Sequence, residues 1–136
     1  MDEKKLNELR KKLTKLAKRY GIAYAILFGS QAEGRAIKGE SDVDIAIKIK
    51  KRRLSRREKA KLILDLAREL NGSIDIVILN DAPFSVAFDA LLRGKVLIVN
   101  DESELFRYRE LVFKLHDDFN RISRIFEKRE MEKLRG

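Results

Sequence analysis

The stretch from Leu27 to Ile47 constrains the fold of this chain most strongly, because one apolar run ends there and a second begins. The first run covers residues 22–28 and stops at Gly29 and Ser30. A polar segment that contains glycine then leads to the second run, residues 42–49. This pattern predicts two buried strands that are joined by a tight turn and a polar loop.

The second run alternates carboxylates with aliphatic residues. Successive side chains of a strand point to opposite faces, so Asp42 and Asp44 are expected to share one face. Two neighbouring carboxylates repel each other, and a cation between them removes that cost. Hard oxygen ligands of this kind predict Mg²⁺ or Mn²⁺. The aliphatic side chains share the opposite face and are expected to enter the core: Val43, Ile45, Ile47 and Ile49.

The periodicity elsewhere predicts an α/β (α+β) fold, in which a small mixed sheet of about four strands carries flanking helices. Ser55 and Glu58 form a capping-box pattern at the start of one helix. With 136 residues and no linker-like stretch, the chain is expected to form a single domain, 1–136. The expected helices are 2–20, 55–70, 81–93 and 102–134, and the further strands are 73–79 and 95–99.

Asp75 is the only acid in the otherwise apolar run of residues 73–79. A charge on a central strand is costly unless it is paired or binds a metal ion. The functional interpretation is therefore a third carboxylate that faces Asp42 and Asp44. The alternative is an edge strand on which Asp75 lies in water.

The composition limits the partners and the kinds of site. The chain has no cysteine, which excludes disulfides and thiolate zinc sites. Its net charge of +9 suits acidic partners such as nucleotides or RNA. For the basic run at residues 48–57, a solvated loop is favoured over RNA contact. The longest apolar runs are too short for a membrane span, so a cytoplasmic protein without membrane contact is expected.

The last expected helix, about 102–134, is longer than a small domain needs to cover its own sheet. Its apolar residues recur in steps of three and four, as in a heptad seam. The early part, from Leu105 to Leu115, is expected to pack on the sheet. The later residues Phe119, Ile122 and Phe126 are expected to contact a second chain, either another copy or a different partner.

Three acids on neighbouring strands beside a Gly-Ser turn indicate nucleotidyl transfer. Metal ions held by Asp42 and Asp44 would bridge a triphosphate and the attacking oxygen. Asp75 would share a metal ion and accept the proton of an attacking hydroxyl. Ser30 and nearby backbone N–H groups would bind the β and γ phosphates.

These residues resemble the signature of polymerase β-type nucleotidyltransferases, in which a Gly-Ser pair precedes Asp-x-Asp and a later Asp. Over residues 1 to about 126 the chain is similar to the minimal nucleotidyltransferase (MNT) antitoxins of bacteria and archaea. The resemblance implies the polymerase β-like fold, ATP as substrate and a HEPN-domain RNase toxin as partner. It further implies transfer of AMP onto a tyrosine of that toxin, which silences the RNase.

The resemblance carries over to a defined set of residues. Ser30 and the first Asp are separated by eleven residues, one more than the commonest interval in the family. Roles within this loop are therefore not assigned, at Gln31, Arg35 or Ser41. The positions that match are Gly29, Ser30, Asp42, Asp44 and Asp75.

Two other functions compete with protein adenylylation. An antitoxin that neutralises by binding alone would not need the three acids. A nucleotidyltransferase for a small molecule such as an aminoglycoside usually carries a second domain for the acceptor, and this chain leaves no residues for one.

Overall fold

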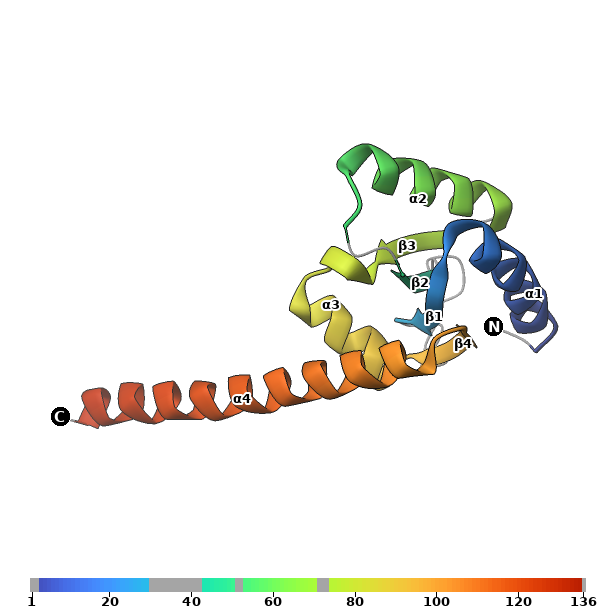
Figure 1. Cartoon of the computed structure of the whole chain (residues 1–136). Coiled ribbons are helices and arrows are strands. Elements are labelled where there is room, and N and C mark those ends of the chain that lie inside the picture. The colour runs from blue at the N-terminus through green and yellow to red at the C-terminus, as the bar shows by residue number, and fades with distance from the viewer. Residues whose placement is uncertain (1–2, 30–42, 51–52, 71–73, 136) are drawn as a thin grey trace.

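The computed structural model describes residues 3–29, 43–50, 53–70 and 74–135. Four strands form one sheet in the order β3-β2-β1-β4, and helices cover both of its faces (Figure 1). Strand β1 pairs antiparallel with β2 and β4, whereas β2 and β3 are parallel. This mixed sheet with flanking helices confirms the predicted fold class. The strands are β1 (Ile22–Phe28), β2 (Val43–Ile49), β3 (Ile74–Ile78) and β4 (Lys95–Val99).

Three of the four predicted helices are present as expected: α1 (Glu3–Tyr20), α2 (Arg56–Leu70) and α4 (Glu102–Arg135). The capping box of α2 is formed, because the Glu58 N–H donates to Ser55 Oγ at 3.1 Å and the Ser55 N–H donates to Glu58 Oε1 at 3.2 Å. The Glu104 N–H likewise donates to Asp101 Oδ1 at 3.1 Å at the start of α4.

The helix predicted from Asp81 to Arg93 is interrupted. A 3₁₀ turn (Leu79–Asp81) comes first, then α3 (Phe84–Phe88) and a π-helical segment, η2 (Asp89–Arg93). Ala82 is extended, with φ −70° and ψ 149°. A residue before proline avoids the helical region, so Pro83 delays the start of the helix.

The core has two layers, one on each face of the sheet. Helices α1 and α2 pack on the first face, with the aliphatic residues of β2 that the alternation predicted: Val43, Ile45, Ile47 and Ile49. α3, η2 and the first turns of α4 pack on the second face, together with Phe28 and Ala46. Asp44 therefore lies on the face of α3 and α4, because it shares the phase of Ala46.

Helix α4 packs on the sheet only through its first part and then projects away from the domain (Figure 1). Leu105 and Val112 are buried and Tyr108 is half-buried. Leu115 was predicted to pack on the sheet, and that prediction is wrong: the side chain is 45% exposed. The apolar seam shifts by about 20° per heptad around a straight helix, and α4 has passed the sheet by this point. None of the helices in the described residues has the length and apolarity of a membrane span.

Candidate active site

Two of the predicted acids face each other across neighbouring strands. Asp44 and Asp75 are direct partners in the parallel β2–β3 ladder. Partners in register project from the same face of the sheet, and their strands are about 4.8 Å apart. β3 is an edge strand that leaves Asp75 exposed, as in the alternative interpretation. Its register brings Asp75 beside Asp44, whereas the expected approach to Asp42 falls outside the described residues.

Gly29 brings the β1 turn against the same pair. It follows Phe28, which is the partner of Asp44 in the antiparallel β1–β2 ladder. Its φ is +78°, a conformation that side chains other than glycine rarely adopt. A Cβ added at Gly29 would also collide with Oδ2 of Asp44. Only glycine therefore leaves room for the Asp44 carboxylate at this turn.

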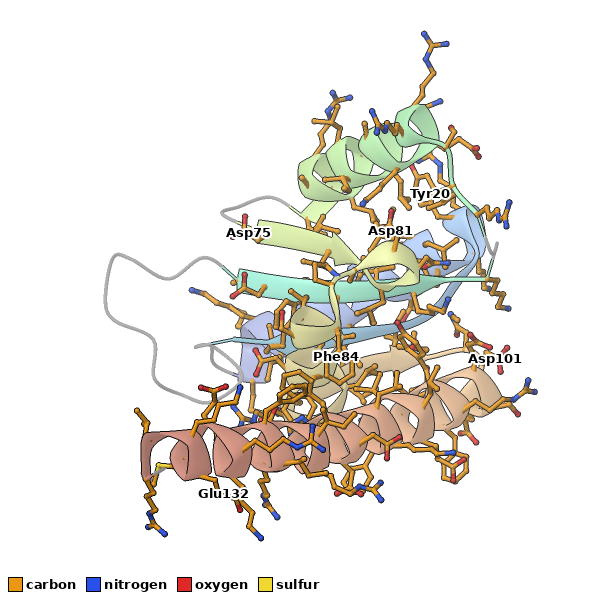
Figure 2. All side chains as sticks on the ribbon, turned by 90° about the vertical axis from the view of Figure 1, so that its left-hand side faces the viewer. Tyr20, Asp75, Asp81, Phe84, Asp101 and Glu132 are labelled. Carbon is orange, nitrogen blue, oxygen red and sulfur yellow. The ribbon has the colours of Figure 1, made fainter. Side chains whose placement is uncertain are left out.

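The site lies at one end of the sheet. In Figure 2, Asp75 lies at the opposite end of the sheet from Tyr20 and Asp101. The site is therefore formed where β1 ends and where β2 and β3 begin. Ser30 and Asp42, which were predicted to complete it, lie outside the described residues.

The donors that are described suit a hard divalent cation. Asp44 and Asp75 offer carboxylate oxygens from one face of the sheet, and such oxygens are the ligands that Mg²⁺ and Mn²⁺ prefer. Within the described residues, which are 3–29, 43–50, 53–70 and 74–135, no three His, Asp or Glu side chains form a metal-binding group. The third predicted ligand, Asp42, falls in the gap between these ranges.

A polar cluster beneath α4, which the sequence analysis did not predict, lies on the same face. Lys48 Nζ lies 3.8 Å from Glu104 Oε1 and 5.6 Å from the centroid of the Tyr108 ring. The Tyr108 hydroxyl donates to the carbonyl oxygen of Leu79 at 3.3 Å. Burial, reinforced by the charge of Glu104, raises the pKa of Tyr108. The cluster ties the first turns of α4 to β2 and to the residue after β3. Its only sequence signal is Lys48, a polar residue in the phase of Asp44.

Comparison with known proteins supports the assignment of the fold. Residues 11–103 match the profile of the family described as polymerase beta, nucleotidyltransferase. A comparison with curated protein sequences gave no significant match.

Solved structures with this fold include chains of toxin–antitoxin complexes. One, from a complex with AMP-PNP, has a TM-score of 0.69 and 21% identity and covers 90% of this chain and 98% of its own. Another, from a complex of a tri-AMPylated Shewanella oneidensis HEPN toxin with its MNT antitoxin, has a TM-score of 0.67 and 19% identity, with coverages of 93% and 98%.

A third structure has a higher identity and a smaller overlap. It is a candidate minimal nucleotidyltransferase with 28% identity and a TM-score of 0.54, and it covers 69% of this chain and 94% of its own. The family profile spans more than half of the chain, across all four strands and α2. The chain therefore belongs to the polymerase β nucleotidyltransferase family.

Proposed function

We propose that this protein transfers AMP from ATP to a tyrosine hydroxyl of a HEPN RNase toxin and thereby acts as its antitoxin. The observation that carries the proposal is the register of Asp44 with Asp75 beside Gly29. Membership of the nucleotidyltransferase family supports the reaction class. Structural neighbours described as bound to AMP-PNP and as paired with a tri-AMPylated HEPN toxin support the substrate and the partner.

In this proposal the three acids bind the metal ions, and the Gly-Ser turn binds the phosphates. Asp42, Asp44 and Asp75 hold Mg²⁺ or Mn²⁺, which supplies charge neutralisation for the triphosphate when it is bound. Ser30 and the backbone at Gly29 hold the β and γ phosphates. The acceptor oxygen forms a bond to the α-phosphorus, pyrophosphate leaves, and Asp75 accepts the hydroxyl proton.

The exposure of Asp75 supports a protein acceptor. Because β3 is an edge strand, Asp75 is open to solvent on the side that no other strand covers. A hydroxyl on the surface of another protein can approach it without entering a closed pocket.

The projecting part of α4 supports a stable protein partner. Three aromatic and aliphatic side chains of the seam are 63%, 53% and 61% exposed: Phe119, Ile122 and Phe126. Their spacing matches the anchors of a helix that binds in a groove. We therefore propose that this seam docks on the toxin and that the docked toxin presents its tyrosine to Asp75.

Growth rescue separates catalysis from neutralisation by binding alone. A HEPN toxin is expressed together with the wild type or with Asp44→Asn. We expect rescue by the wild type and toxicity with Asp44→Asn at equal protein levels. Full rescue by Asp44→Asn would instead show that binding suffices.

A further inference from the structure

The positive charge of this protein is concentrated on one layer of the fold. Helix α1 carries eight Lys and Arg residues against two Glu in 18 residues. Helix α4 carries nine Lys and Arg residues against eight Asp and Glu in 34 residues. A general enrichment in charged residues would give the two helices a similar net charge. The excess on α1 therefore needs its own explanation.

Four of the six lysines of α1 share one outward face, with Glu8 beside them between Lys4 and Lys11. Side chains at intervals of three, four and seven residues project from the same side of a helix. Lys4, Lys11, Lys15 and Lys18 follow such intervals, are exposed, and lie opposite the buried leucines of α1. From Lys4 to Lys18 the face is about 21 Å long.

Few of these charges are neutralised within the protein. In the described part of the chain, none of Lys4, Lys11, Lys15 and Lys18 has a carboxylate within 4.0 Å, whereas the charges of α4 include two pairs along the helix. Those pairs are Arg121 with Asp118 at 2.6 Å and Lys133 with Glu130 at 3.6 Å. Unpaired lysines in a row repel one another, and an extended polyanion would relieve that repulsion.

Two described residues that follow β2, Lys50 and Arg53, add to this positive charge. The Lys50 N–H donates to the carbonyl oxygen of Gly21 at 2.8 Å, which places Lys50 next to the end of α1. A cavity there is lined by two basic residues, Arg19 and Lys61, and by two acids, Glu58 and Asp65, among other residues. Exposed Lys50 and Arg53 therefore extend the positive charge from the end of α1 toward α2, which contacts α1.

We propose that the outer face of α1, with Lys50 and Arg53, binds the phosphodiester backbone of a nucleic acid. A membrane fits this face less well. Interfacial helices insert an apolar side into lipid, whereas the leucines of α1 are at most 7% exposed beneath the lysines. The α1 face lies on the opposite side of the sheet from Asp44 and Asp75. Nucleic acid and a protein acceptor can therefore be bound together, and this inference does not depend on the proposed function.

The test is fluorescence anisotropy of the full chain with labelled 20-nucleotide single-stranded RNA, single-stranded DNA and duplex DNA, from 50 to 200 mM salt. A triple variant, Lys11→Gln with Lys15→Gln and Lys18→Gln, removes three charges from α1. The control, Lys114→Gln with Arg124→Gln and Lys128→Gln, removes three exposed charges from α4. Both variants have the same net charge, and thermal melts verify their folding.

We expect the α1 variant to bind at least tenfold more weakly than wild type at 100 mM salt and the control to bind nearly as wild type. In the α1 variant the slope of log K against log salt should become less steep by about 2 for single strands and by nearly 3 for duplex DNA. Each lost phosphate contact removes about 0.7 from the steepness for single strands and about 0.9 for duplex DNA. The three probes show whether RNA or DNA is preferred. Equal weakening in both variants, or no binding of any of the three probes at 50 mM salt, would overturn the proposal.

Discussion

At the scale of single residues, Gly29 determines where the Asp44 carboxylate lies. Gly29 combines a φ of +78° with a position at which a Cβ would meet Oδ2 of Asp44. Gly21 has a similar φ of +66°, but a Cβ there would meet no atom within 4 Å. An alanine at Gly21 would therefore introduce backbone strain alone. An alanine at Gly29 would introduce the same strain and would also displace the Asp44 carboxylate.

Gly29→Ala should lower AMP transfer at least tenfold, because the methyl group pushes Asp44 away from its position beside Asp75. Gly21→Ala should lose only about 1–2 kcal/mol of stability and keep its activity. Transfer assays and thermal melts on both variants check this. Equal activity in the two alanine variants would show that Asp44 does not need its present position.

Asp75→Asn should abolish transfer and leave the fold intact. Asp75 is exposed and sits beside Asp44, so loss of its charge removes a like-charge repulsion. The midpoint of thermal unfolding should stay the same or rise. Asp117→Asn, an exposed site on α4, serves as the matched control with full activity. A sharply lowered midpoint for Asp75→Asn would identify the residue as structural.

Tyr24 is a buried residue whose hydroxyl group makes no hydrogen bond within the described part of the chain. It is fully buried. Burial raises the pKa of Tyr24 above its ordinary value of 10.0. As the pH rises, the unfolded chain loses the Tyr24 proton before the folded chain does. The stability that this pKa shift contributes is therefore complete below pH 10 and is lost as the pH rises above it.

Tyr24→Phe should raise the free energy of unfolding by about 1 kcal/mol, because it removes a buried unpaired hydroxyl. It should also weaken the fall of stability above pH 10. Tyr108→Phe removes the hydrogen bond to Leu79 and should lower stability by about the same amount. Urea titrations at pH 8 and pH 10.5 measure both effects. A clear loss of stability in Tyr24→Phe would mean that its hydroxyl is bonded in solution.

At the scale of elements, the boundaries of β1 and β4 match the predicted residues 22–28 and 95–99, because short apolar runs end at glycine or polar residues. Alternation along β2 also predicted which of its side chains enter the core. The alignment of Asp44 with Asp75 was not determined by local pattern, because strand pairing depends on contacts between distant residues. The exposure of Leu115 depends likewise on where the sheet ends, which the heptad seam of α4 does not encode.

The α4 seam is expected to hold the partner through its aromatic residues. Phe119→Ala with Phe126→Ala should weaken binding of the toxin by a few kcal/mol, as loss of central aromatic anchors does, and should preserve the fold. Phe106→Ala with Phe113→Ala is the matched control, since these residues are 64% and 63% exposed and also seven residues apart. They lie more than 100° around the helix from the seam.

Calorimetric titration of the toxin into each double variant measures the effect on the α4 seam. Equal losses in both variants would show that the seam is not the docking surface. Unchanged binding in Phe119→Ala with Phe126→Ala would place the interface elsewhere on the protein.

At the scale of the whole molecule, the sheet separates two surfaces with different character. The face with Asp44 carries α3 and the start of α4, and the opposite face carries the basic helix α1. The projecting half of α4 leaves the domain from the face that carries α3 (Figure 1). A protein bound along α4 is therefore held on the face that carries Asp44 and Asp75, which is the arrangement that transfer to a protein hydroxyl requires.

The most direct test is mass spectrometry of a HEPN toxin after incubation with this protein, ATP and Mg²⁺. We expect peptides that contain a toxin tyrosine to gain the mass of AMP with the wild type. Asp44→Asn, Asp75→Asn or excess chelator should prevent the gain, whereas Asp117→Asn should not. An unmodified toxin that is nevertheless bound and inhibited by the wild type would contradict AMP transfer and favour neutralisation by binding alone.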